Sequence, residues 1–143
     1  MLKLRKNKKG FTLVELIVVI AIMAVLAGTV AGVTVSQLNK QTDKSGDTQA
    51  KLIADYVVQE LGANRDSVLD ESGTDTKFKN TFENTIKTDM KNDKIPFGTD
   101  KGQITVTVTN TSVTIVYKAK ASGAKDITYT VDTEGKITRT VAQ

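Results

Sequence analysis

The sequence contains no cysteine and no histidine, and its only proline is Pro96. Without cysteine the chain can form neither a disulfide nor a thiolate metal site, and it has no thiol nucleophile. Without histidine it lacks the side chain that most often acts as a general acid or base. No nucleophile elbow or phosphate-binding loop is present, and the charged residues are scattered rather than convergent. We therefore expect a protein that is not an enzyme and that binds no cofactor and no metal.

Charge is absent from one long stretch near the amino terminus. The twenty residues 16–35 contain no charged side chain. As a helix they would extend about 30 Å, the thickness of the hydrocarbon core of a bilayer. Five cations precede the stretch within residues 1–10. Such cations stay on the cytoplasmic side, so the pattern predicts a single membrane-spanning helix with an exported carboxyl-terminal part.

The basic charge of the chain resides in its first ten residues. The formal net charge is +4 at pH 7, and residues 1–10 contain five cations and no acid. Removing those five charges leaves −1 for residues 11–143, which have no basic stripe with interleaved aromatic residues. Because nucleic-acid binding depends on positive charge against the phosphate backbone, we predict no nucleic-acid partner.

The segment KKGFTLVELIVVIAI, residues 8–22, resembles the class III signal of type IV prepilins and of the pseudopilins of secretion and competence systems. The resemblance implies that a prepilin peptidase cuts between Gly10 and Phe11 and methylates the new amine of Phe11. It divides the chain into a cleaved basic leader at residues 1–10, a transmembrane and filament-core helix at residues 11–35, and an exported pilin head at residues 36–143.

Glu15 is the single acid at the start of the apolar run. An ionised carboxylate within a bilayer costs about 2.5–3.5 kcal/mol on insertion scales, so Glu15 needs a partner. The resemblance implies that in a helical assembly this partner is the amine of Phe11 on a neighbouring subunit, which is free only after cleavage. The alternative is that Glu15 snorkels to the headgroups near the start of the helix.

Gly28 and Gly32 form a GxxxG spacing within the apolar run. Small residues at this spacing let membrane helices approach closely. Each glycine also lowers helix stability by about 1 kcal/mol relative to alanine. Two interpretations therefore remain open, because the two glycines either pack against other helices or soften the helix inside a filament.

The helical pattern continues beyond the apolar run and predicts one helix that ends near Gly62. Its second half is amphipathic, with a predicted core stripe of Leu52, Ile53, Tyr56, Val57 and Leu61. Residues 41–48 around Gly46 form its weakest part. We expect this part either to bend or to present a face of small residues to a sheet.

A second helix is predicted at residues 77–91, between the long helix and the strands. Its capping residue is expected at Thr74, Asp75 or Thr76, and its core face is expected to consist of Phe78, Phe82, Ile86 and Met90. The acids Asp66, Asp70, Glu71 and Asp75 precede it. Because they lack the spacing of an EF-hand, a solvated loop is favoured over a calcium site.

From Gln103 onward the apolar period is two, which is typical of half-buried strands. Four strands are predicted, with the inward-facing residues Ile104, Val106 and Val108, then Val113, Ile115 and Tyr117, then Ile127, Tyr129 and Val131, and finally Ile137 and Val141. Short turns join them into an antiparallel meander with a threonine-rich outer face. The predicted fold class is α+β: a long amino-terminal helix packed against a four-stranded antiparallel β-meander, with a helical αβ-loop.

The resemblance implies a structural subunit of a type IV pilus, a fimbrium for adhesion, twitching motility or biofilm formation. The implied partners are further copies in a helical homopolymer, the prepilin peptidase, the pilus assembly platform with its ATPase, and the cytoplasmic membrane. The precursor would cross that membrane once before it joins an extracellular filament. Two alternatives remain: a pseudopilin of a type II secretion or competence system, and a minor pilin or adhesin.

Overall fold

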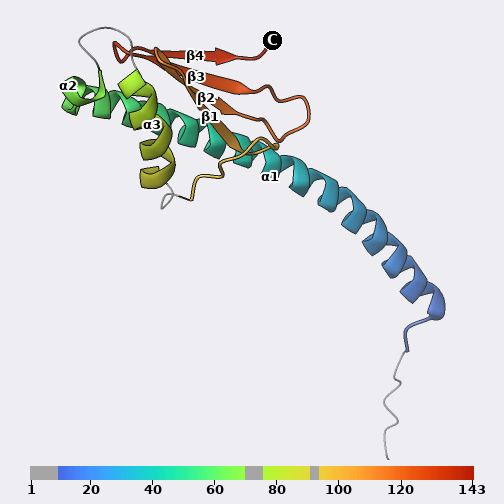
Figure 1. Ribbon diagram of the computed structural model, residues 1–143. Coiled ribbons are helices and arrows are strands. Elements are labelled where there is room, and N and C mark those ends of the chain that lie inside the picture. Colours follow the sequence, from blue (N-terminus) through green and yellow to red (C-terminus); the bar gives the residue numbers. More distant parts are fainter. Residues whose placement is uncertain (1–9, 70–75, 91–93) are drawn as a thin grey trace, which may run out of the picture. The chain divides into compact units, whose positions relative to one another are not determined.

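The computed structural model describes residues 10–69, 76–90 and 94–143. Within them lie the helices and strands labelled in Figure 1: α1 (Leu13–Ala63), α2 (Arg65–Val68), α3 (Thr76–Asp89), β1 (Ile104–Val108), β2 (Ser112–Tyr117), β3 (Ile127–Asp132) and β4 (Ile137–Val141). The chain divides into two compact units, Met1–Gln37 and Leu38–Gln143, and we call the second unit the head. Because α1 runs through both units, its two parts are described separately.

In the first unit, α1 exposes every side chain from its start at Leu13. Its apolar residues are among the most exposed of the chain, with 73% of Leu13 and 59% of Val35 accessible. The uncharged sequence forms the predicted helix because leucine and alanine favour the helical state, and because hydrogen bonds within the helix satisfy its backbone where no water is available. Within residues 10–37, the described part of this unit, nothing covers this apolar surface.

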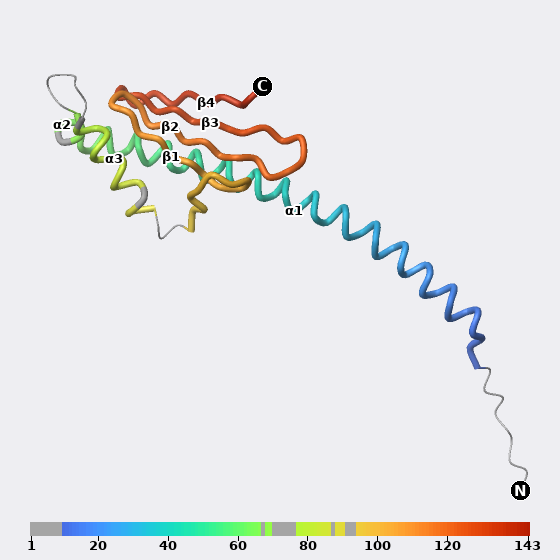
Figure 2. Tube along the Cα trace, turned by 45° about the vertical axis from the view of Figure 1, so that its right-hand side comes forward, coloured from blue at the N-terminus to red at the C-terminus, as the bar shows by residue number. Residues whose placement is uncertain are grey.

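The head contains a four-stranded antiparallel sheet in the order β1-β2-β3-β4, as the period of two predicted. Figures 1 and 2 show the four strands side by side, with the carboxyl-terminal part of α1 along one face of the sheet. The predicted α+β fold is therefore confirmed. On the other face, four threonines lie opposite one another across all four strands: Thr107, Thr114, Thr130 and Thr138.

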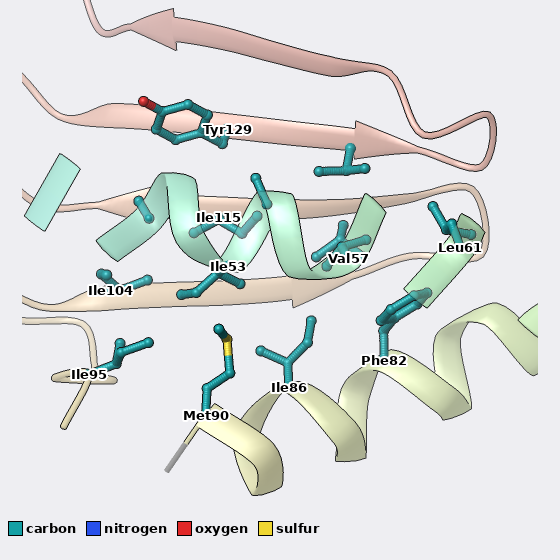
Figure 3. Packing of buried hydrophobic residues seen from close by; sticks show 14 of the residues in the cluster. Ile53, Val57, Leu61, Phe82, Ile86, Met90, Ile95, Ile104, Ile115 and Tyr129 are labelled. Atoms are coloured by element: carbon teal, nitrogen blue, oxygen red, sulfur yellow. The ribbon is translucent and has the colours of Figure 1, made fainter. Parts of the chain in front are cut away.

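The core lies between the inner face of the sheet and the second part of α1 (Figure 3). The prediction for Ile53, Val57 and Leu61 is confirmed, since all three are buried. The prediction for Leu52 is wrong, because this side chain is 47% exposed. Successive residues of a helix point about 100° apart, and the buried stripe is completed by Ala50 instead, together with Ala54. Small residues at these places let the sheet lie close to the helix.

Residues 41–48 were expected either to bend or to present a face of small residues, and the structure shows the second. The helix continues without a break through this stretch, and Gly46 is buried. The aromatic ring of Tyr117 lies where a Cβ atom on Gly46 would be, so any larger side chain would overlap it. Glycine therefore allows β2 to approach the helix.

The helix predicted at residues 77–91 is α3, Thr76–Asp89. Its predicted core face is confirmed, because Phe78, Phe82, Ile86 and Met90 are all buried. The rings of Phe78 and Phe82 meet edge to face with their centroids 4.9 Å apart, the favoured geometry for an aromatic pair. Two of the three expected capping residues lie outside the described residues, and Thr76 is the first residue of the helix. The short helix α2, which places Val68 in the core, was not predicted.

Candidate processing and assembly site

The predicted cleavage junction lies just before α1, on backbone outside any helix or strand. Phe11 is 91% exposed, and no atom lies within 4 Å of the position that a Cβ on Gly10 would take. Because α1 begins only at Leu13, the peptide bond between Gly10 and Phe11 is free of helical hydrogen bonds. A peptidase could therefore reach this bond without unwinding the helix.

Thr12 and Glu15 lie together at the start of α1 and form a reciprocal cap. The Glu15 carboxylate accepts hydrogen bonds from the Thr12 backbone N–H at 2.8 Å and from its hydroxyl at 2.9 Å. The Glu15 N–H in turn donates to the Thr12 hydroxyl oxygen at 3.3 Å. This arrangement is a capping box, which satisfies amino-terminal N–H groups that have no partner within the helix.

The cap gives Glu15 a partner within its own chain, which the sequence reasoning missed. The T-x-x-E spacing of Thr12 and Glu15 was the local signal that could have predicted it. One oxygen of the carboxylate, Oε2, accepts both bonds from Thr12. The capping contact therefore leaves the second oxygen available to another donor. An intersubunit partner remains a prediction.

Gly28 and Gly32 lie within regular helix, one turn apart on the same face of α1. No atom lies within 4 Å of the Cβ position of either glycine. The structure thus places both on an exposed surface, and the choice between close packing and softening stays a prediction.

Asp43 joins the second part of α1 to the loop that follows β2. Its carboxylate accepts hydrogen bonds from the N–H groups of Lys120 at 2.7 Å and Ala121 at 3.0 Å, and from the Tyr117 hydroxyl at 2.9 Å. Partial burial tends to raise the pKa of Asp43, but the bonds from Lys120 and Ala121 outweigh it and hold the pKa below its ordinary value. Burial, and then the bond to Asp43, raise the pKa of Tyr117 above its ordinary range.

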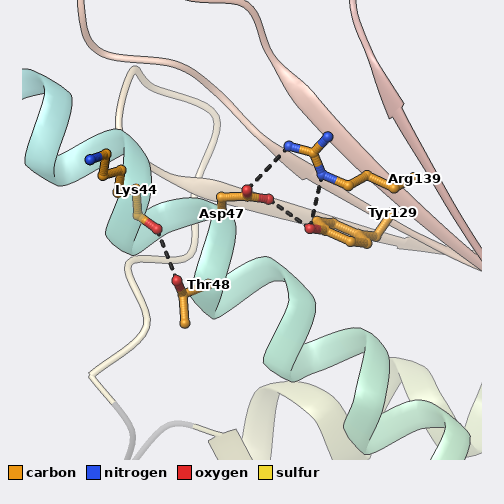
Figure 4. A network of polar contacts seen from close by, with 5 residues as sticks. All are labelled: Lys44, Asp47, Thr48, Tyr129 and Arg139. Carbon is orange, nitrogen blue, oxygen red and sulfur yellow. Dashed lines mark hydrogen bonds and ion pairs between the residues drawn. The ribbon is translucent and has the colours of Figure 1, made fainter.

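Asp47, one turn further along α1, makes a second attachment (Figure 4). Its carboxylate accepts hydrogen bonds from the Tyr129 hydroxyl at 2.7 Å and from Nη2 of Arg139 at 3.1 Å. Nε of Arg139 also donates to the Tyr129 oxygen at 3.1 Å. Burial, and then the bond to Asp47, raise the pKa of Tyr129. Together with Asp43, this network fixes the position of the sheet along the helix, and no sequence motif predicted it.

The acidic loop considered as a calcium alternative is only partly described. Asp70, Glu71 and Asp75 lie outside the described residues, and Asp66 is exposed in the first turn of α2. Within residues 10–69, 76–90 and 94–143, no group of three or more acidic, cysteine or histidine side chains could hold a metal ion. Among the described acids, Glu15 caps α1, and Asp43 and Asp47 attach the helix to the sheet and its loops.

These features define an α+β chain with one long amino-terminal helix, whose first turn is capped by Thr12 and Glu15. Among the described residues, α1 is the one helix that is long and apolar enough to cross a membrane. A family model for the prokaryotic N-terminal methylation motif matches residues 5–31, which include the junction, Glu15 and most of the apolar run. Comparisons with curated proteins and with solved structures give no significant match.

The motif match confirms the predicted class III signal of type IV pilins. It indicates a precursor of the type IV pilin-like or pseudopilin kind, which implies processing by a prepilin peptidase and assembly at a membrane. The match lies entirely outside the head.

Proposed function

We propose that this protein is a structural subunit of a type IV pilus, cleaved between Gly10 and Phe11 and assembled into a surface filament. One observation carries the proposal. The uncovered apolar helix of the first unit lies largely within the methylation motif, whereas the head has a closed core of its own. The chain therefore presents a surface that must be buried outside itself. This role requires no catalysis by the chain.

The exposed apolar surface decides where a single subunit resides. At about 25 cal/mol per Å² of apolar surface, exposing such a helix to water would cost many kcal/mol. A lone subunit is therefore held in the cytoplasmic membrane. Only a bundle of equivalent helices can replace the lipid, so extraction by an assembly platform and its ATPase is coupled to the addition of each subunit. The finished fibre would serve adhesion, motility or biofilm formation.

Glu15 gives the sharpest test of assembly through the helix. Glu15→Gln retains an oxygen that can accept the bonds from Thr12, but it removes the charge. Glu15→Leu removes both the cap and the charge. We expect both variants to be cleaved normally, because the leader side of the junction is unchanged. We also expect both to lose at least about tenfold in fibre yield, which corresponds to a loss of about 1.4 kcal/mol in the free energy of assembly.

The yield of sheared fibres and the mass of the mature chain measure the two steps separately. Normal fibre yield from Glu15→Gln with loss only from Glu15→Leu would show that the cap matters and the charge does not. That result would refute pairing of Glu15 with the amine of Phe11. Accumulation of uncleaved precursor in either variant would refute the assumption that cleavage is independent of Glu15.

Electron microscopy of sheared surface material, with mass spectrometry of the purified fibres, tests the proposed function directly. We expect long fibres composed mainly of this chain, beginning at a methylated Phe11. A processed chain that remains in the membrane would instead support a pseudopilin of a type II secretion or competence system. A processed chain found in fibres only in trace amounts would support a minor pilin or adhesin.

A further inference from the structure

The outer edge of β1 carries backbone groups that point away from the sheet. The Lys118 N–H donates to the Gln103 carbonyl at 3.0 Å, and the Thr109 N–H donates to the Ser112 carbonyl at 2.9 Å. In antiparallel pairs, hydrogen-bonded positions alternate with non-bonded ones, so the N–H and C=O groups of Val106 and Val108 face away from β2.

The first part of this edge is covered by another segment of the head. The Ile104 N–H donates to the Pro96 carbonyl, and the Gly98 N–H donates to the Ile104 carbonyl, both at 2.9 Å. Phe97 and Ile104 thereby form a parallel bridge. In the described part of the chain this cover ends at Gly98, and no segment pairs with Val106 or Val108.

A slot lies beside this uncovered part of β1. It has a volume of about 190 Å³ and separates β1 from α3. Lys79 and Glu83 of α3 line it, opposite Val106, Thr107 and Val108 of β1. Phe82 and Ile86 lie behind them, fully buried in the core of the head. An unpaired strand edge beside an open slot can accept an added strand through main-chain hydrogen bonds.

Among the described residues, no segment pairs with the opposite edge of the same sheet, which is formed by β4. The Ala142 N–H donates to the Asp126 carbonyl at 2.9 Å, and the Asp132 N–H donates to the Lys136 carbonyl at 3.3 Å. By the same alternation, the N–H and C=O groups of Ile137, Arg139 and Val141 face away from β3. The side chain of Val141 is 44% exposed, so this edge also leaves apolar surface uncovered.

We propose that β4 of a second copy of this chain pairs with β1 at the slot, so that the sheets of adjacent heads become continuous. The inference rests on the proposed function, in which many copies stand side by side with their helices pointing the same way. Because each sheet has four alternating strands, β4 of such a copy runs antiparallel to β1, as every other neighbouring pair in the sheet does.

The two edges match in hydrogen bonding and in side-chain direction at the same time. Val106 and Val141 both direct their backbone groups outward, and both belong to the inner face of the sheet. Pairing them would place the inner face of one sheet beside that of the next, with Arg139 opposite Val108 and with the covered edge at Ile104 beyond Val141. Thr107 would then lie opposite Thr140 on the outer face. A shift by one residue would destroy both matches.

The contact uses two different surfaces, so each added copy leaves the same pair of edges open. Such a heterologous contact does not close on itself unless its rotation forms a ring. Neighbouring strands rotate by about 20–25° relative to one another, so successive heads would also turn. A continuous sheet therefore favours a helical array of heads.

Disulfide trapping tests the pairing, because the natural chain contains no cysteine. Thr107 and Thr140 would face each other as a non-hydrogen-bonded pair, in which the Cα atoms are about 4.5 Å apart, within the range that a disulfide spans. Thr107→Cys/Thr140→Cys traps this register, and Thr107→Cys/Thr138→Cys traps the register two residues away. Thr48→Cys/Thr107→Cys is the matched control, because Thr48 is exposed on α1.

The measurement is non-reducing electrophoresis of fibres sheared from cells that produce each full-length variant. We expect one of the two test pairs to give a ladder of dimers, trimers and larger species, whereas the control pair and each single cysteine give monomers. Fibres without cross-links from both test pairs would overturn the inference and leave the proposed function standing. Dimers from Thr107→Cys, Thr138→Cys or Thr140→Cys alone would also overturn the inference, because they would show that the same edge of two copies is in contact. Absence of fibres from the parent chain would refute the proposed function and the inference with it.

Discussion

Two glycines of the same helix are expected to respond to alanine in opposite directions. Gly46 and Gly62 both lie in α1, where alanine is intrinsically better by about 0.5–1 kcal/mol. No atom lies within 4 Å of the Cβ position of Gly62, so Gly62→Ala should gain stability. At Gly46 the new methyl group would overlap the ring of Tyr117. At Gly46, the local environment rather than helix propensity decides the sign of the change in stability.

The magnitude for Gly46→Ala follows from how firmly the ring of Tyr117 is held. The side chain is fully buried, and its hydroxyl donates to Asp43 at 2.9 Å. Overpacking of a well-filled core costs about 1–3 kcal/mol, and weakening a hydrogen bond to a charged group costs about 1.5–3 kcal/mol. When both costs apply and the gain in helix propensity is subtracted, we expect a net loss of about 1.5–5.5 kcal/mol.

Thermal unfolding of the full chain in detergent micelles, followed by circular dichroism, measures both variants. For a domain of about 100 residues, 1 kcal/mol shifts the midpoint by roughly 4–8 °C. Gly46→Ala should therefore unfold at least about 4 °C below the parent chain, and Gly62→Ala at or above it. In a Tyr117→Leu background, Gly46→Ala should lose its penalty. An equal or higher midpoint for Gly46→Ala than for Gly62→Ala would refute the close approach of β2 to the helix.

Three further predictions concern the attachment of α1, the core and the junction. Asp43→Asn should be less stable than the parent at pH 7 by about 1–3 kcal/mol, with exposed Asp55→Asn near neutral. Because folding lowers the pKa of Asp43, its contribution exists above the unfolded pKa and is lost as the pH falls below about 4, where the difference in midpoints should shrink. Phe78→Ala should cost about 3–5 kcal/mol and Leu52→Ala much less, by denaturant unfolding, and equal losses would contradict the assigned core. Gly10→Val should block processing, and a shortened mature chain on a denaturing gel would contradict the proposed cut.

The elements could be predicted because their signals are local. The period of two from Ile104 to Val141 and the spacing of Phe78 and Phe82 determine which face of each element is apolar. Leu52 was assigned wrongly because a leucine in a helical pattern outweighed Ala50, although the small residue was the one that the sheet required. Apolar size and burial are different properties at a close helix–sheet contact.

The attachments of the head could not be predicted, because their partners lie far apart in the chain. Asp43 and Tyr117 are separated by 74 positions, and Asp47 and Arg139 by 92. A single sequence does not distinguish a polar helix residue that faces solvent from one that contacts a sheet. The cap of Thr12 on Glu15 spans only three positions and was predictable from its spacing.

Substitutions are expected to be tolerated differently at two sets of positions in the head. The first set consists of the small residues Gly46, Ala50 and Ala54, and the second consists of the threonines of the outer face. The first three are buried where the sheet packs on the helix, so replacement by a larger residue is expected to lower the stability of the head. The threonines of the outer face support no part of the core, because each side chain points away from it. The solvent-facing side of the sheet can therefore diverge in sequence without loss of the core. The small residues of α1 that contact the inner face of the sheet cannot.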